Sequence, residues 1–306
     1  MNTQERPQLP PEVSRTLHRI DHARHAIRFA AFVGLFIASS AAAIWLAQAV
    51  GWVWALPFSL IAGASLHGIS LFTHEAVHGT LCALPFWNRL LGAACAIPVL
   101  QNCTAYRVLH LRHHRHLGED GDPDHYANYT RWTWMIFCLN WLRLLVGYPV
   151  YIVAIPVLGF RHGTWRDRLG IIAELAATAV LASAILRAPI PASWLLYGWL
   201  VPMLFINTMV NIRGMSQHTL LEQSSDEILG TRTILTSPVV RFFMCNENYH
   251  LEHHLHPGVP WNQLPALHAT LSPELRQRGA PYIPSYSSFV RDFILRSIER
   301  APWKKS

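Results

Sequence analysis

Residues 29–73, FAAFVGLFIASSAAAIWLAQAVGWVWALPFSLIAGASLHGISLFT, contain no Asp, Glu, Lys or Arg. At about 1.5 Å per helical residue this run is roughly 67 Å long, enough for two crossings of a ~30 Å hydrocarbon core. Gln48–Gly51 is the natural turn, so the run predicts a helical hairpin with spans at about 29–48 and 52–73. An uncharged stretch of this length indicates an integral membrane protein.

A second hairpin is expected at about 169–187 and 193–212, on either side of the breaker Ala188–Pro191. The composition agrees with a membrane protein, because only 14% of the residues are charged, against about 25% in a soluble domain. Two other apolar segments, 81–100 and 144–160, are interrupted by prolines, and we expect them to be interfacial or re-entrant helices.

The predicted fold is therefore all-α and membrane-integral, with four transmembrane helices as two hairpins, interfacial helices and a cytoplasmic histidine-rich cap. The predicted parts are a cytoplasmic basic amphipathic arm (1–28), the membrane domain (29–272) and a cytoplasmic C-terminal tail (273–306). Arginines concentrate in the arm and in the loop 105–168, whereas the two hairpin turns hold only Arg187. By the positive-inside rule both termini and the loop should be cytoplasmic, and we expect a bacterial inner membrane.

The chain has 18 histidines, and many form three boxes. Box one is HEAVH (74–78), box two is HLRHH (110–114) and box three is HLEHH (250–254). Residues at i, i+3 and i+4 share a helix face, so each box can present its imidazoles to one point. With His218 the boxes supply nine imidazoles, too many for one four-coordinate zinc. Two metal ions suit this number, although imidazoles alone do not distinguish Fe, Cu, Ni and Zn.

Other interpretations of these motifs explain less of the sequence. Box one also matches the HExxH pattern of zinc proteases, but a protease site would leave most of the clustered histidines without a role. The sequence HPGV at 256–259 is similar to a haem-binding motif of cytochrome b5, but it adjoins box three and lacks a haem domain. A histidine-rich metal transporter or a cytochrome remains the non-enzyme alternative.

The three boxes, in this order around two hairpins, resemble the membrane fatty acid desaturase superfamily, whose relatives include alkyl hydroxylases and carotenoid ketolases. The flanks HLRHHRHLGEDGDPDHY (110–126) and NYHLEHHLHPGVPWNQLPALH (248–268) strengthen the resemblance. The resemblance implies two non-haem irons that use O₂ to desaturate a fatty-acyl or lipid-like substrate. By motif position it implies as ligands His74, His78, His110, His113, His114, His218, His250, His253 and His254.

The resemblance leaves the reaction and the substrate partly open. The same site could hydroxylate or ketolate a hydrocarbon, a carotenoid or a small amino-acid-derived metabolite. Electrons should come from a separate ferredoxin, rubredoxin or cytochrome b5-like protein, and the remaining expected partners are the bilayer and the substrate, with no nucleic acid. Acyl-CoA desaturases place an Asn one turn before the histidine that corresponds to His218, but here Gly214 holds that position and Asn211 lies a turn earlier.

Several neighbouring residues have both a functional and a structural interpretation. Carboxylates near the boxes either orient ligating imidazoles or are exposed; they are Asp120, Asp122, Asp124, Glu75 and Glu252. The remaining histidines near the boxes or the spans are expected to play supporting roles; they are His116, His125, His256 and the intramembrane His67. His18, His22 and His25 are expected on the amphipathic arm.

Overall fold

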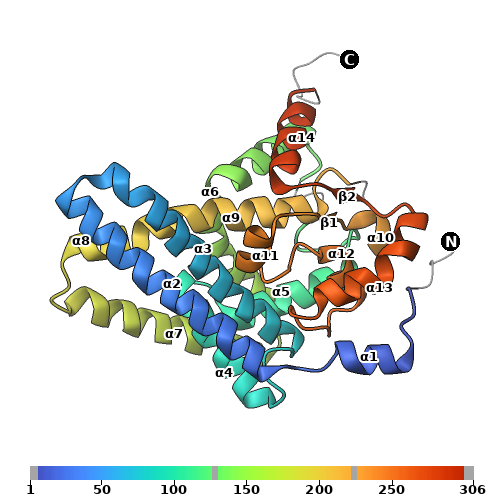
Figure 1. Ribbon diagram of the computed structural model, residues 1–306, viewed down its shortest axis with the longest axis horizontal. Helices are drawn as coiled ribbons and strands as arrows, with labels where there is room; N and C mark the ends of the chain where they lie inside the picture. Colours follow the sequence, from blue (N-terminus) through green and yellow to red (C-terminus); the bar gives the residue numbers. More distant parts are fainter. Residues whose placement is uncertain (1–5, 126–129, 222–225, 300–306) are drawn as a thin grey trace. The chain divides into compact units, whose positions relative to one another are not determined.

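The computed structural model describes residues 6–125, 130–221 and 226–299, and these residues are mostly helical (Figure 1). The helices are α1 (Pro11–Leu17), α2 (His22–Ala49), α3 (Trp52–His78), α4 (Pro85–Ala96), α5 (Cys103–His116), α6 (Thr133–His162), α7 (Trp165–Arg187), α8 (Ala192–Leu195), α9 (Val201–His218), α10 (Glu227–Gly230), α11 (Pro238–Phe243), α12 (His250–Leu255), α13 (Leu264–Gln277) and α14 (Tyr286–Glu299). The short strands β1 (Thr233–Ile234) and β2 (Tyr282–Ile283) pair in parallel. The predicted helical class is confirmed.

Among the described residues, five helical segments are long and apolar enough to cross a bilayer. They are Pro11–Ala49, Trp52–His78, Trp134–His162, Trp165–Arg187 and Ala192–His218. Four of them contain the predicted spans, and the additional candidate lies in α6. Helix α6 continues through Pro149 and Pro156 but leaves helical geometry at Val146 (φ −139°, ψ 24°). The sequence had suggested that the two prolines interrupt this apolar segment, but the helix continues through both of them.

The first hairpin turns where the uncharged run predicts it. Gly51 has φ 142°, a conformation that favours glycine. The following helix α3 does not stop at the end of the apolar run but continues through box one to His78, where Gly79 ends it in the left-handed conformation (φ 74°). The membrane span and box one are thus one continuous helix, which fixes the direction of both imidazoles.

The start of α5, which carries box two, is attached to α7. The Asn102 side chain accepts a hydrogen bond from the Ala105 backbone (2.8 Å) and donates one to the carbonyl of Ile171 (3.1 Å). The Glu174 carboxylate accepts hydrogen bonds from the hydroxyl (2.5 Å) and the backbone N–H (3.2 Å) of Thr104. These bonds satisfy amides in the first turn of α5, which lack partners within the helix.

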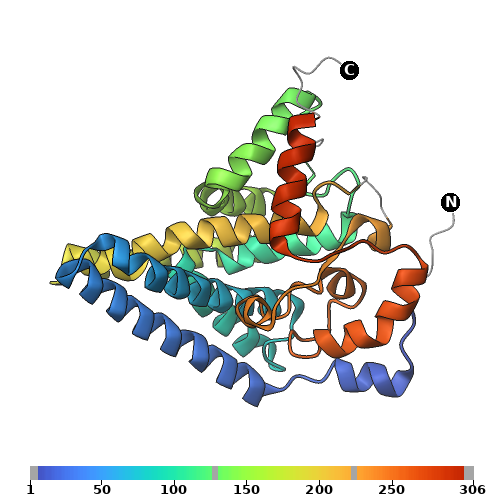
Figure 2. The same cartoon turned by 45° about the horizontal axis from the view of Figure 1, so that its top comes forward.

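The chain forms two compact units. The span unit comprises Asp21–Leu109 and Tyr148–Val210; the histidine unit comprises Met1–Ile20, His110–Gly147 and Asn211–Ser306. The boundary between the units falls within the segment predicted as the arm (1–28). Helix α1 ends at Leu17, and α2 starts after Asp21, whose side chain caps α2 by accepting a hydrogen bond from the Arg24 backbone (3.0 Å). In the histidine unit, α1 lies beside α13 (Figure 2), with Leu17 buried among leucines of α12 and α13.

Candidate metal centre

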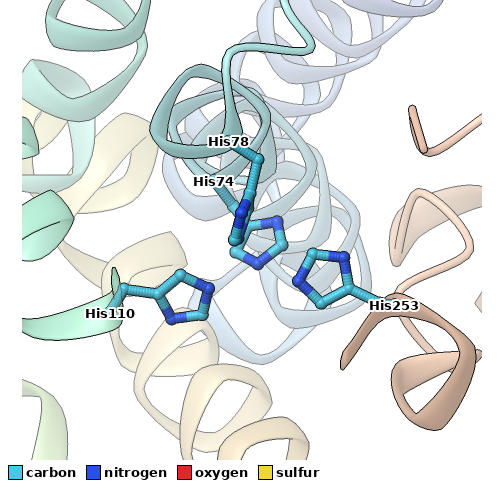
Figure 3. A group of neighbouring side chains, drawn as sticks. All are labelled: His74, His78, His110 and His253. Atoms are coloured by element: carbon cyan, nitrogen blue, oxygen red, sulfur yellow. The ribbon is translucent and has the colours of Figure 1, made fainter. Parts of the chain in front are cut away.

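Box one supplies two imidazoles from the last turns of α3. His74 and His78 are one helical turn apart, and their ring centroids are 4.8 Å apart. His74 is buried. Figure 3 draws this pair together with two histidines from the other boxes, His110 of α5 and His253 of α12. The pair offers two imidazole nitrogens, which are too few to hold an iron or zinc ion alone.

Boxes two and three come together within the histidine unit, with the Nε2 atoms of their imidazoles facing one another. The Nε2–Nε2 distances are 3.1 Å for His110–His114, 3.3 Å for His114–His253, 3.1 Å for His250–His254, 3.2 Å for His218–His250 and 3.3 Å for His113–His218. His218 therefore lies between a residue of box two and a residue of box three. His113, His218 and His254 can together hold one metal ion.

The tautomers of two of these histidines require a cation between their rings. His218 Nδ1 donates to the carbonyl of Gly230 (3.0 Å), and His113 Nδ1 donates to the carboxylate of Asp122 (2.8 Å). In the neutral form each Nε2 then carries a lone pair, and two lone pairs face each other at 3.3 Å. Only a proton or a metal ion makes that contact favourable, so the residues present fit a bound metal.

The protonation of these imidazoles depends on burial and on nearby charges. Burial opposes a charge on His113, but the hydrogen bond to Asp122 and the charge of Asp124 outweigh it and raise the pKa of His113. Burial and the neighbouring imidazoles, His114 first among them, lower the pKa of His254 well below its ordinary value. His254 is therefore neutral at pH 7, the form that binds metal ions.

Of the three aspartates after box two, Asp122 contacts a predicted ligand most closely. It is buried, and besides His113 it accepts hydrogen bonds from the backbones of Gly118 (3.2 Å) and Asp124 (2.9 Å). The Asp124 carboxylate is 3.9 Å from His113 Nδ1 and largely exposed, and Asp120 is exposed. Asp122 therefore has the position of a carboxylate that orients a ligating imidazole.

Glu247 is a buried carboxylate that the sequence analysis missed. It lies three residues before His250, and its carboxylate is 3.7 Å from His250 Nδ1. Residues three apart share a face only if the chain turns helically between them. Glu247 precedes the first residue of helix α12, His250. The only indication in the sequence was therefore the three-residue spacing between Glu247 and His250. At 3.7 Å the Glu247 carboxylate is beyond hydrogen-bond distance of His250 Nδ1, so it acts on His250 through its charge, whereas Asp122 holds His113 by a hydrogen bond of 2.8 Å.

Glu252 lies inside box three, but its carboxylate is hydrogen-bonded to residues outside the boxes. It is fully buried, accepts a hydrogen bond from His268 Nδ1 of α13 (2.5 Å) and another from the Thr233 hydroxyl of β1. The sequence left two interpretations of Glu252 open: it could orient a ligating imidazole, or it could be exposed. The structure shows a different role for its carboxylate. Glu252 attaches the box-three helix to α13 and β1.

We expect His268→Ala to reduce the free energy of unfolding by about 3–5 kcal/mol, because the buried Glu252 carboxylate then keeps the Thr233 hydroxyl but loses the His268 imidazole. Thermal and denaturant unfolding in detergent micelles measure this change. The matched control is Glu274→Ala on the same helix, which removes the half-exposed partner of Arg278 (3.1 Å) and should cost about 1 kcal/mol or less. Equal effects of the two substitutions would show that Glu252–His268 does not hold α12.

The remaining histidines have structural surroundings. His67 is completely buried within α3. His25 is buried with its Nε2 3.7 Å from Glu75, whose carboxylate also accepts a hydrogen bond from Thr80 (2.8 Å). The His256 ring packs edge-on against His18 (6.4 Å). His116 and His125 belong to none of the possible metal-binding groups found in the described part of the chain.

The guanidinium of Arg143 lies beside Gly214, the residue one helical turn before His218. A Cβ atom at Gly214 would lie 3.1 Å from Nη2 of Arg143, so the missing side chain leaves room for this guanidinium. Asn211 is buried, and its side-chain oxygen would lie 2.7 Å from a Cβ at Gly147. An arginine from α6 thus occupies the space beside His218 where the family resemblance suggested an asparagine.

Comparison with known proteins identifies the family. Residues 50–286, more than half of the chain, match the Fatty acid desaturase family. The chain is 25% identical over 281 residues to the sphingolipid delta(4)-desaturase of Xenopus tropicalis (86% of this chain, 79% of the relative). It is 27% identical over 268 residues to the sphingolipid delta(4)-desaturase/C4-monooxygenase of Bos taurus (82% and 76%). It is 26% identical over 245 residues to the dihydrorhizobitoxine desaturase of Bradyrhizobium elkanii (69% and 66%).

Three findings agree: apolar helices long enough to span a bilayer, clustered imidazoles suited to metal, and the match over residues 50–286. The chain is an integral-membrane, metal-binding oxidoreductase that belongs to the fatty acid desaturase family.

Proposed function

We propose that this protein is an O₂-dependent di-iron desaturase of a long-chain lipid with a polar end, of the kind that the sphingolipid desaturases named above act on. The observation that carries the proposal is the set of Nε2 atoms that face one another in the histidine unit. Hydroxylation of the same lipid is the second candidate, because the bovine relative is named both a desaturase and a C4-monooxygenase.

The proposed ligands divide into two sets. By the motif positions that the family resemblance implies, one iron would bind to His74 and His78 of box one together with His110 and His253. The second iron would bind to His113, His218 and His254, and His114 and His250 would complete the two sets. Iron bound there would supply, with O₂ and two electrons, an oxidant able to remove hydrogen from an unactivated C–H bond, which no side chain can do.

The chain's own residues hold and orient this centre. The Asp122 carboxylate and the Gly230 carbonyl fix the Nδ1 tautomers of His113 and His218, and thereby direct both Nε2 atoms inward. The box-three imidazoles are each at most 3% exposed, so bulk water is excluded from them. A dry site prevents side reactions of a strong oxidant.

The proposed topology keeps four complete crossings. Boxes two and three lie in one unit, so the chain between them must cross the bilayer an even number of times. Helices α6, α7 and α9 are three candidates, and α6 is the one interrupted, at Val146. Its first half packs against α14 through Trp141 and Phe293 (5.3 Å). We therefore propose that α6 is interfacial or re-entrant, with the centre and both termini cytoplasmic.

The test is expression with a ferredoxin, a rubredoxin or a cytochrome b5 as external electron donor, followed by mass spectrometry of lipids and metal analysis of the purified protein. We expect two irons per chain and a product lighter than its precursor by two hydrogens. A product heavier by one oxygen atom would favour hydroxylation. Zinc in place of iron, with no product from any donor, would contradict the proposal.

A further inference from the structure

Two hydrogen-bond donors lie buried on one face of α9, immediately before His218. Arg213 and Gln217 are four residues apart and therefore share a helix face. Within the described part of the chain, neither the Nε of Arg213 nor the Nε2 of Gln217 has a hydrogen-bond partner, and both atoms are inaccessible to water. Gln217 is only 7% exposed. Buried donors are nearly always paired, so these two indicate an acceptor that the described part of the chain does not supply.

A third such group approaches from α14. Phe289 and Phe293 of α14 pack against Met215 of α9, which brings the start of α14 to the end of α9 (Figure 2). The hydroxyl of Tyr286, in the first turn of α14, is also buried without a partner among the described residues. Burial raises the pKa of Tyr286, while the positive charge of Arg213 opposes this change and the negative charge of Glu247 adds to it. Tyr286 therefore stays protonated and can donate.

These donors adjoin the proposed metal centre. Gln217 precedes the proposed ligand His218 in the sequence, and Nη2 of Arg143 would lie 3.1 Å from a Cβ atom at Gly214, the residue after Arg213. The charge of Arg143 acts on His113, where it opposes the increase in pKa. The region beside the centre thus contains two arginines and further donors, together with the buried carboxylate of Glu247.

We propose that Arg213, Gln217 and Tyr286 bind the oxygen-bearing polar end of the substrate, an amide carbonyl or a carboxylate. This inference rests on the proposed function and names the part of the substrate that is recognised. A single water molecule or amide carbonyl accepts two hydrogen bonds, whereas a carboxylate has about four acceptor positions and can pair with a guanidinium through two parallel bonds. The three donors therefore match a carboxylate completely and an amide carbonyl in part. Binding here would set the distance between the polar end and the carbon atoms that reach the metal centre.

The test measures lipid binding, separately from turnover, with the full-length iron-loaded protein in detergent. The probes are N-acyl sphinganine, which offers an amide carbonyl, and palmitate, which offers a carboxylate. We expect Tyr286→Phe to weaken binding of the recognised probe about 5- to 10-fold and Arg213→Met by more, as expected for hydrogen bonds to neutral and charged groups. Iron content should be unchanged in Tyr286→Phe. Preference for one probe identifies which oxygen group is bound.

The matched control is Tyr282→Phe, since the Tyr282 hydroxyl is also buried without a partner in the described residues but lies beside Arg276, whose guanidinium is 4.4 Å from the ring. This control should bind both probes like the wild type. If Tyr286→Phe and Tyr282→Phe bind alike, the donors hold ordered water only and the inference is wrong. If the substitutions weaken probe binding as expected but no product forms with any electron donor, the binding site is supported and the desaturase proposal is wrong.

Discussion

Replacing His113 by alanine should remove iron from the centre and abolish product formation. The Nε2 of His113 faces that of His218 at 3.3 Å, and its Nδ1 is already held by Asp122. No other atom of residue 113 can replace this ligand, because alanine ends at Cβ. We expect the loss of activity to exceed the roughly 10- to 100-fold effect of changing a group that only orients a ligand. Iron per chain and product by mass spectrometry measure the two effects.

The control for this substitution is His116→Ala, in the last turn of the same helix. His116 belongs to no possible metal-binding group in the described residues, so its substitution should leave iron and product near wild-type levels. If His113→Ala retained both, the di-iron assignment would be wrong. If both variants lost iron equally, the effect would reflect damage to α5 as a whole.

Asp122→Asn should weaken metal binding about 10- to 100-fold without removing any ligand. Asparagine keeps the shape of the side chain but loses the charge that makes the His113 ring a stronger metal ligand. Its amide can also present N–H instead of oxygen to Nδ1, and that orientation would turn the imidazole away. Competition with a chelator measures the affinity, and the iron absorption spectrum should change even where iron remains bound.

The matched control is Asp120→Asn, in the same acidic turn but exposed to solvent. It should leave the affinity within about twofold, because surface charges are screened by solvent. A similar loss in both variants would mean that the net negative charge of the turn, and not the Asp122–His113 hydrogen bond, supports the metal.

The parts of the fold that depend on local pattern could be predicted from the sequence. The charge-free run at 29–73 predicted the first hairpin and its turn, because the cost of charge in lipid leaves few other arrangements. The spacing within box two and box three predicted that each would present its imidazoles on one helix face. His218 belongs to no box and was singled out by its place after the last predicted span and by the family resemblance; the structure places it between His113 and His250.

The parts that depend on contacts distant in the sequence could not be predicted. Glu252 has the same position in its box whether it faces solvent, an imidazole ligand or His268, and only the packing of α13 decides among these. Likewise, nothing in the sequence around Gly214 indicates that a guanidinium from position 143 fills its place. The continuation of α6 through two prolines is a third case, since helix propensity predicts a break there.

The burial of Leu17 also sets the order in which the protein can be assembled during synthesis. Leu17 packs with Leu251, Leu255, Leu271 and Leu275, so its partners are made roughly 250 residues later. At ~5–20 residues per second the ribosome needs about 12–50 s to cover that distance. Throughout this interval the apolar face of α1 has no native partner, and the helix that carries box three cannot acquire its complete packing until translation is nearly over. Metal loading should therefore be a late event, following chain completion.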